Sequence, residues 1–98
     1  MNRSQVLQLL QIHLPTIEAM GVRSLALFGS VARDEARPES DIDFAVEFSM
    51  PTTFDGYMNL KILLEDTLGQ DIDLVPIQSM KPEVKETMQK DIYYVTQN

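Results

Sequence analysis

The sequence predicts an α+β domain in which helices pack on a small mixed sheet of about four strands. Three observations favour this class. Residues 41–48 alternate strictly between polar and apolar, residues 25–28 are apolar throughout, and longer segments repeat apolar residues every three or four positions. These patterns are typical of a half-buried strand, a strand covered on both faces, and helices with one buried face.

The first helix is predicted over residues 4–20, because apolar residues recur along one face: Val6, Leu10, Leu14, Ile17 and Met20. Pro15 lacks an N–H donor, so we expect it to kink or restart this helix. Gly21 is a helix stop. A strand over residues 22–28 follows, then a break at Gly29-Ser30 and a short helical turn over residues 31–33.

The second half of the chain continues the alternation of strands and helices. The alternating segment 41–48 is the second strand. A helix over 54–68 turns Tyr57, Leu60, Leu64 and Leu68 inward and stops at Gly69. A third strand over 71–77, a helix over 82–90 and a final strand over 92–95 complete the order. We expect Tyr93 and Tyr94 to pack that strand against the core; the alternative is that one ring reaches an adenine.

Length and charge limit the possible functions. We expect the 98 residues to form a single domain, 1–98. With 8 basic and 15 acidic residues, the formal charge is −7. That charge argues against direct nucleic-acid binding, which needs a basic surface, and permits a basic protein partner or metal ions. No membrane span or signal peptide is recognisable, and the lack of cysteine fits a cytoplasmic location. Homo-oligomerisation is left open.

A glycine and a serine stand where the first strand meets the helical turn. Gly29 lets the backbone approach a ligand closely. The free N–H groups of the next turn and the hydroxyl of Ser30 suit an anion such as phosphate. Taken alone, the same pair also suits an ordinary turn.

Two aspartates, Asp41 and Asp43, lie two positions apart on the second strand, so their carboxylates point to one face. Aspartate is depleted in strands, and such a pair repels unless a cation lies between. The alternative is an edge strand with a solvated acidic face. Asp71 and Asp73 repeat the pattern on the third strand. If the two strands are neighbours, three carboxylates gather, which suits a hard cation such as Mg²⁺.

Together these segments resemble a known signature. Residues 28–33, FGSVAR, with residues 40–46, SDIDFAV, are similar to the motif of the DNA polymerase beta-like nucleotidyltransferases. More closely, the chain resembles the minimal nucleotidyltransferases, the small partners of HEPN-domain proteins. Residues 70–75, QDIDLV, resemble that family's third-carboxylate strand. The similarity covers about residues 14–95 and implies the polymerase beta-like fold.

The resemblance implies roles for the glycine-serine turn. Gly29 and Ser30 would hold the β- and γ-phosphates of ATP. Arg33 would either contact phosphate or brace the loop. One residue departs from the pattern: members usually have glycine after this arginine, where this chain has Asp34. The resemblance leaves open whether Asp34 tightens the loop or adds repulsion near the triphosphate.

The resemblance also implies roles for the acidic residues. Asp41 and Asp43 would bind two Mg²⁺ ions. Asp73 would complete one metal site and help to deprotonate the attacking hydroxyl. It is preferred over Asp71 because the family carboxylate directly precedes an apolar pair, here residues 74–75. Asp71 remains a candidate to support the metal ligands without binding the metal itself.

The implied reaction is attack of an acceptor hydroxyl on the α-phosphorus of ATP, with pyrophosphate leaving. Larger members carry an extra domain for the acceptor, and we expect no room for one here. The resemblance implies a tyrosine of a HEPN-domain toxin as acceptor, which makes this chain an antitoxin. The alternatives are a non-catalytic antitoxin that neutralises a HEPN partner by complex formation and, less favoured, a nucleotidyltransferase of an aminoglycoside-like small molecule.

Overall fold

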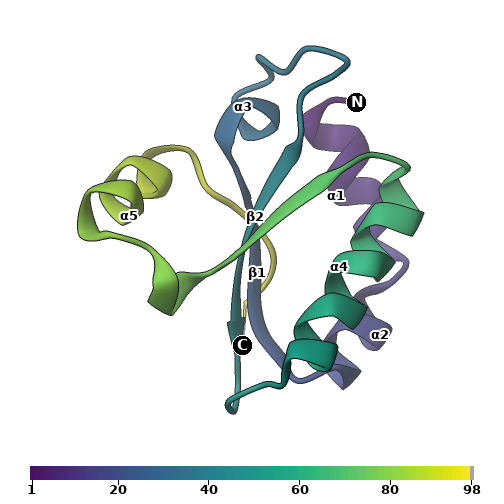
Figure 1. Cartoon of the computed structure of the whole chain (residues 1–98). Coiled ribbons are helices and arrows are strands. Elements are labelled where there is room, and N and C mark those ends of the chain that lie inside the picture. Colours follow the sequence, from purple (N-terminus) through teal and green to yellow (C-terminus); the bar gives the residue numbers. More distant parts are fainter. Residues whose placement is uncertain (98) are drawn as a thin grey trace.

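A four-stranded mixed sheet lies at the centre of the computed structural model, which describes residues 1–97 (Figure 1). Its strand order is β3-β2-β1-β4. β1 pairs antiparallel with β2 and β4, whereas β2 and β3 are parallel. The predicted fold class is confirmed. The strands are β1 (Val22–Phe28), β2 (Ile42–Phe48), β3 (Ile72–Pro76) and β4 (Tyr93–Gln97).

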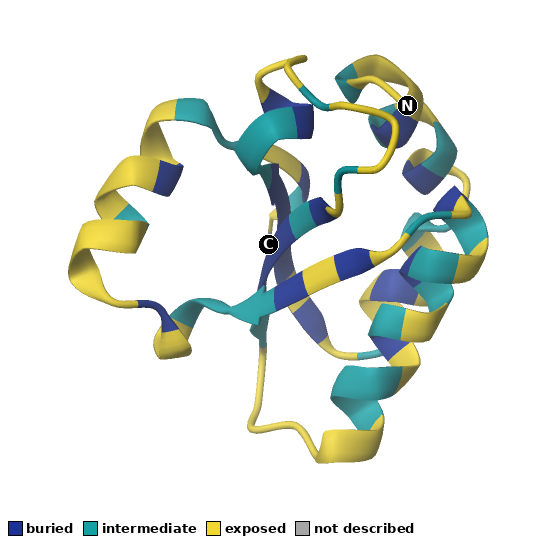
Figure 2. Cartoon of the chain, turned by 45° about the horizontal axis from the view of Figure 1, so that its top comes forward, coloured by how far each residue is buried: buried dark blue, intermediate teal, exposed yellow. Residues whose placement is uncertain are grey.

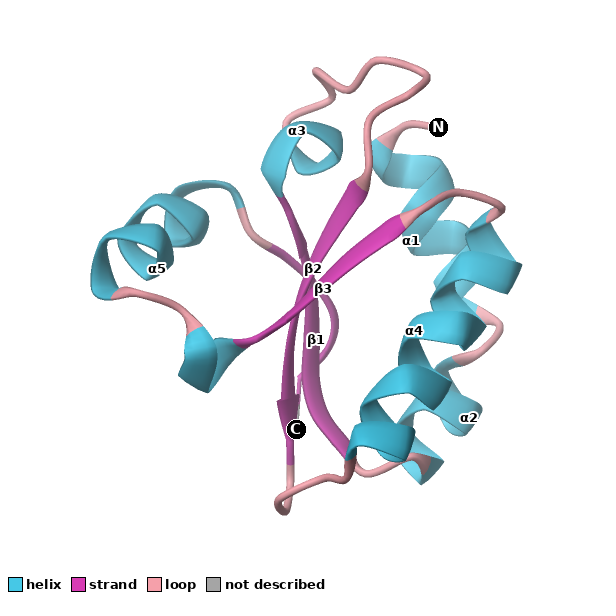
Figure 3. Ribbon diagram, in the orientation of Figure 1, coloured by secondary structure: helices cyan, strands magenta, loops and turns pink. Residues whose placement is uncertain are grey.

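The helices flank this sheet, as Figure 3 shows by colour. Pro15 restarts the first predicted helix, since it lies in the first turn of α2 after α1 has ended. In the part of the chain that the structure describes, no helix combines the length and apolar surface that a bilayer crossing requires. The helices are α1 (Arg3–Gln11), α2 (Leu14–Ala19), α3 (Gly29–Ala32), α4 (Phe54–Leu68) and α5 (Pro82–Met88), with 3-10 turns η1 (Ile77–Ser79) and η2 (Gln89–Asp91).

Helix α4 forms the crossover that the parallel pair β2 and β3 requires. It spans the predicted residues 54–68. At its start the side chain of Thr53 accepts a hydrogen bond from the N–H of Gly56 at 3.0 Å. At its end Gly69 adopts φ +66°, the left-handed conformation that glycine favours. After this crossover the chain re-enters the sheet beside β2, so β3 becomes the parallel neighbour of β2.

Two apolar layers cover the two faces of the sheet. The larger one lies between the sheet and α1, α2 and α4, on whose inner sides the buried positions concentrate (Figure 2). The smaller one lies on the α5 side and combines Ala45, Met80 and Met88 with Phe28, Val75, Ile77 and Ile92. Strand β1 is therefore covered on both faces, as its apolar run predicts. The acidic residues of β2 and β3 share the α5 face with the smaller layer.

The edge-strand alternative for residues 41–48 is excluded, because β2 lies between β1 and β3. One prediction is wrong. Tyr93 and Tyr94 do not pack in the core: 39% and 44% of their surface is exposed. They belong to β4, which forms an edge of the sheet, and Val95 is the strand's buried residue.

Candidate active site

The turn at Gly29 is shaped by a close approach to Asp43. Phe28 and Asp43 are paired across β1 and β2. Gly29 adopts φ +78°, and a Cβ atom there would overlap the carboxylate of Asp43. Glycine is thus required twice, by the backbone angle and by the neighbouring side chain. The predicted phosphate turn and the predicted metal-binding pair are therefore in contact.

The third carboxylate joins them through strand pairing. Asp43 and Asp73 are partners in the parallel register of β2 and β3. Their neighbours Ile42 and Ile72 belong to the larger core, so both carboxylates point to the opposite face. The N–H of Ile42 donates to the C=O of Asp71 at 3.1 Å, which extends the pairing by one step. The expectation that the third strand neighbours the second is confirmed.

Asp41 directly precedes β2, and Asp71 directly precedes β3. Both residues are exposed. The two residues line one hollow at the end of the sheet, together with Pro38, Glu39, Ser40, Gly69 and Gln70. The structure thus places all four aspartates at the same end of two adjacent strands. Asp43 is the most enclosed of them, whereas Asp41, Asp71 and Asp73 are exposed.

Electrostatics set Asp43 apart. The pKa of Asp43 is raised from an ordinary 3.8 to about 6. Burial of its carboxyl group is the largest cause, and the negative charges of Asp73 and Asp41 add to it. Arg33 acts in the opposite direction and lowers this pKa. Asp41, Asp73 and Arg33 therefore lie close enough to Asp43 for their charges to be felt there.

The donor set suits a hard cation, although its side chains are not drawn together in this conformation. Among residues 1–97, no three acidic, histidine or cysteine side chains lie close enough to hold one metal ion. The carboxylates of Asp73 and Asp41 nevertheless repel that of Asp43, a repulsion that adds to the effect of burial on its pKa. A divalent cation would relieve that repulsion, and carboxylate oxygens are ligands that Mg²⁺ prefers. The residues present fit such an ion by charge and by donor chemistry.

Arg33 and Ser30 complete the turn. The guanidinium of Arg33 lies 3.2 Å from the carboxylate of Glu35 and lines the cavity described below. The C=O of Ser30 accepts a hydrogen bond from the N–H of Glu35 at 2.8 Å. The Nε of Arg33 is thus engaged by Glu35, while its positive charge lowers the pKa of Asp43.

Asp34, the residue that departs from the resembling motif, adopts φ +55°. This is the left-handed conformation that glycine would adopt there without strain. Its carboxylate accepts a hydrogen bond from the N–H of Arg3 at 2.9 Å. The acidic group is therefore engaged with α1. Of the two effects left open by the sequence, the geometry agrees with a tightened loop.

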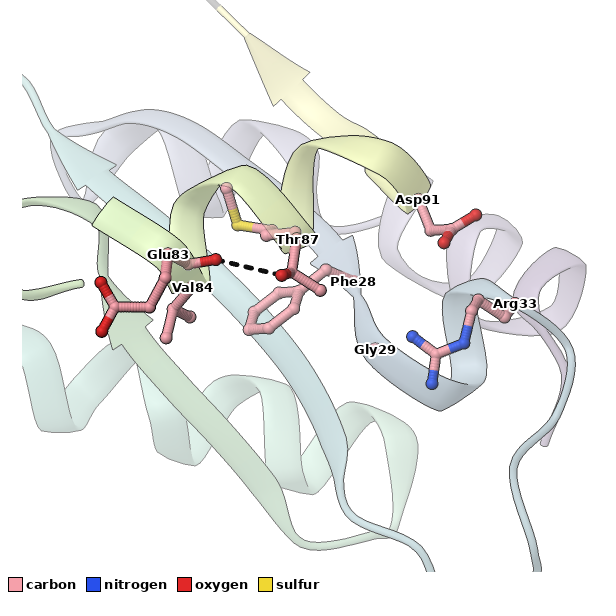
Figure 4. Close-up of a pocket in the computed structure, with 8 residues that line it drawn as sticks. Phe28, Gly29, Arg33, Glu83, Val84, Thr87 and Asp91 are labelled. Carbon is pink, nitrogen blue, oxygen red and sulfur yellow. Dashed lines mark hydrogen bonds between the residues drawn. The ribbon is translucent and has the colours of Figure 1, made fainter. Parts of the chain in front are cut away.

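A cavity of about 360 Å³ adjoins this cluster (Figure 4). Gly29 and Arg33 line it from the turn, and α5 supplies the opposite wall. The ring of Phe28 faces Val84 and Thr87, while Arg33 and Asp91 lie toward the other end. The complete lining is Phe28, Gly29, Arg33, Glu83, Val84, Thr87, Met88 and Asp91.

None of the α5 residues was expected at the site. One signal could have found them: Val84, Thr87 and Met88 are spaced by three and four positions, which places them on one helix face. Met88 is buried in the smaller layer, whereas 44% of Val84 is exposed beside the cavity. The local sequence predicts that these residues form a helix, but it does not predict that the helix packs beside Gly29.

Comparison with known proteins identifies the family. Residues 15–97 match the family model described as polymerase beta, nucleotidyltransferase. The chain belongs to this nucleotidyltransferase family. The resemblance stated from the sequence is confirmed at the level of the family.

Relatives of similar length define the branch of the family. A Methanocaldococcus jannaschii protein, provisionally named a protein adenylyltransferase, is 38% identical over 94% of this chain and 96% of its own. The protein adenylyltransferase MntA of Thermococcus cleftensis is 36% identical over 80% and 79% of the two chains. A solved structure provisionally named a minimal nucleotidyltransferase is 31% identical, with a TM-score of 0.81 and 95% coverage of both chains. The chain is a minimal nucleotidyltransferase.

Two more distant structures share the fold. One is a toxin–antitoxin crystal structure with AMP-PNP, 22% identical, with a TM-score of 0.69 over 100% of this chain and 75% of that one. The other holds a tri-AMPylated HEPN toxin of Shewanella oneidensis in complex with an MNT antitoxin, 21% identical, with a TM-score of 0.60 over 97% and 69%. At these identities the likeness concerns the fold alone.

Proposed function

We propose that this minimal nucleotidyltransferase transfers AMP from ATP to a protein hydroxyl, a tyrosine of a HEPN-domain toxin, and thereby acts as an antitoxin. The observation that carries the proposal is the register of Asp43 with Asp73 beside the Gly29 turn. It brings the carboxylates of Asp43 and Asp73 next to the turn at Gly29, and Gly29 itself lines the adjoining cavity. We place the reaction in the cytoplasm, where ATP is available.

The turn and the carboxylates would divide the work. Gly29 and Ser30 would hold the β- and γ-phosphates, with Arg33 facing them from the same turn. Asp41, Asp43 and Asp73 would hold two Mg²⁺ ions. Bound Mg²⁺ would supply the positive charge that offsets the triphosphate next to an acidic cluster. A chain of net charge −7 would otherwise repel this substrate.

The proposed reaction forms one bond and breaks one. The acceptor oxygen attacks the α-phosphorus of ATP, the bond from that phosphorus to the bridging oxygen breaks, and pyrophosphate leaves. The hydroxyl proton passes to the carboxylate of Asp73. Most of the acceleration would come from positioning and from charge already in place, since phosphoryl-type transfer needs little covalent help from the protein.

The cavity between the turn and α5 offers room for a substrate group. Its volume of about 360 Å³ lies within the ~300–1,000 Å³ range of small-molecule sites. Phe28 and Val84 give it apolar walls, and Arg33 and Asp91 give it charged ones. This composition suits a planar ring with polar edges.

Support for a HEPN partner comes from the relatives. MntA, 36% identical, is named a protein adenylyltransferase, and the same fold occurs in complex with an AMP-bearing HEPN toxin. A protein acceptor also agrees with a chain whose acidic surface disfavours nucleic acid.

The test is a labelling experiment with the HEPN protein encoded nearest to this chain. Purified partner is incubated with this chain, Mg²⁺ and ATP labelled at the α-phosphate, and the modified residue is located by mass spectrometry. Labelled tyrosine supports the proposal, and an unlabelled partner overturns it. The matched variant is the double change Asp41→Ala and Asp43→Ala, which is expected to abolish labelling.

A growth assay separates catalysis from occlusion. The toxin is expressed with the wild-type chain or with the same double variant. Loss of rescue with retained complex formation supports adenylylation as the neutralising event. Full rescue by the variant would instead favour neutralisation by complex formation alone.

A further inference from the structure

Arg3, the first residue of α1, joins three segments that are distant in the chain. Its N–H donates to Asp34 Oδ1 at 2.9 Å, and its Nη1 donates to the C=O of Ala32 at 2.9 Å and to the hydroxyl of Tyr93 at 3.2 Å. Its Nη2 lies 3.5 Å from Asp34 Oδ2, and its guanidinium lies 4.5 Å from the centre of the Tyr93 ring. One side chain therefore ties α1 to the end of α3 and to the edge strand β4.

The residues that Arg3 contacts close the turn that begins at Gly29. Within that turn the N–H of Arg33 donates to the C=O of Gly29 at 3.2 Å, and the N–H of Glu35 donates to the C=O of Ser30 at 2.8 Å. Both ends of the turn are thus bonded to each other. A displacement of residues 32–34 would be transmitted to Gly29 and Ser30.

Asp34 shows that the end of this turn is held from outside. It is the one non-glycine residue with positive φ among residues 1–97. Such a conformation is unfavourable for a residue with a Cβ and persists where the surroundings enforce it. Contacts from the backbone and the side chain of Arg3 converge on its carboxylate. Nearly half of the Asp34 side chain is exposed, and solvent weakens each of its two contacts with Arg3. The hydrogen bond from Arg3 to the C=O of Ala32 therefore adds to them in holding the end of the turn.

We propose that Arg3 is a positioning residue for nucleotide binding: it holds the Gly29–Ala32 turn in the geometry that receives the triphosphate. This inference rests on the proposed function, because it assigns Arg3 to the same nucleotide site. Arg3 acts through Ala32 and Asp34 and does not itself contact the substrate. Tyr93 gives the guanidinium a platform, which explains an exposed aromatic residue at this point of the edge strand.

The experiment measures the turn and the nucleotide separately. Amide hydrogen exchange of Arg33, Asp34 and Glu35 reports on the turn without any nucleotide. Titration with ATP and Mg²⁺ reports the dissociation constant. Arg3→Ala is expected to speed exchange at these three amides and to weaken ATP binding roughly three- to tenfold.

Three variants sharpen the comparison. Arg3→Lys keeps the charge but lacks the planar fork, so it should restore part of the affinity. Asp34→Gly keeps the left-handed backbone without the carboxylate and should fall between wild type and Arg3→Ala. Arg23→Ala removes a comparable arginine, paired with Glu47 at 3.5 Å at the far end of β1, and should leave both readouts unchanged.

Each outcome decides the matter. Unchanged exchange in Arg3→Ala overturns the inference, and so does faster exchange with unchanged ATP affinity, since Arg3 would then be structural only. If the wild-type chain binds no ATP, the proposed function fails. In that case exchange alone decides whether Arg3 holds the turn, so the two failures are distinguishable.

Discussion

A Cβ atom at Gly29 would occupy the space of the Asp43 carboxylate, so the observed position of that carboxylate depends on the missing side chain at residue 29. The relationship links the turn at Gly29 to the acidic cluster through a direct contact. It also makes the candidate site sensitive to a single added methyl group.

Gly29→Ala should abolish nucleotide transfer and lower the melting temperature. The new methyl group would displace Asp43 and would also strain a backbone at φ +78°. Gly21→Ala is the matched control, because Gly21 has φ +84° but no atoms near its absent Cβ. Strain at positive φ costs about 1 kcal/mol or more at either position. Thermal melts and transfer assays should show destabilisation in both variants and lost activity in Gly29→Ala alone; equal activity would contradict the contact argument.

Asp43→Asn should stabilise the metal-free fold near neutral pH and not in acid. Because the pKa of Asp43 rises from 3.8 to about 6 on folding, the folded state binds more protons than the unfolded state within that window. Stability due to this group therefore falls as the pH rises from about 4 to 6 and stays lower above it. Asparagine carries no charge and escapes the loss.

This pH dependence is measured by melting wild type and variant in EDTA at about pH 3.5 and 7.5. The variant should melt several degrees higher at the upper pH only, given ~4–8 °C per kcal/mol for a domain of this size. Asp66→Asn, an exposed carboxylate on α4, is the control. Parallel curves for wild type and Asp43→Asn would show that burial does not penalise this charge.

Millimolar Mg²⁺ with ATP should raise the melting temperature of the wild-type chain by several degrees. The ion would be bound by the folded state and would relieve repulsion among Asp41, Asp43 and Asp73. Asp73→Asn should lose most of this shift. Asp71→Asn should retain it, because Asp71 precedes the same strand but lies outside the proposed ligand set. No shift in the wild type, with or without ATP, would rule out the proposed metal binding.

Val84→Arg should lower transfer at least tenfold with little effect on stability. Val84 faces the cavity beside Phe28 and is 44% exposed, so an arginine can be accommodated by the fold but occupies substrate space. Ile62→Arg is the control, since Ile62 is 47% exposed and lies on α4, which covers the opposite face of the sheet. Steady-state kinetics and thermal melts check both. Comparable activity in the two variants would show that the cavity is not used by substrate.

Much of the fold could be predicted because its signals are local. Val22–Phe28 and Phe54–Leu68 lie where their apolar periods predict them, and other element ends shift by a few residues. A period of two or of three to four is visible within one segment, whichever segments it later meets. The site residues Gly29, Asp41, Asp43 and Asp73 were likewise visible as motifs.

Contacts between distant segments leave no pattern within either segment. The exposure of Tyr93 and Tyr94 depends on β4 being an edge strand, and the wall formed by Val84 and Met88 depends on where α5 docks. The partnership of Arg3 with Asp34 joins two ends of different elements. The apolar periodicity of either segment does not predict such a contact.

The sequence by itself determined the type and order of the elements and the residues proposed to bind a nucleotide, since backbone preference and side-chain chemistry belong to each short segment. The tertiary structure alone decided that Asp73 lies level with Asp43, that α5 closes a cavity beside Gly29, and that Arg3 holds the turn. Those outcomes depend on strand register and helix docking. Both are settled by packing over the whole chain, where burial of the apolar faces selects one arrangement among many that local preference would allow.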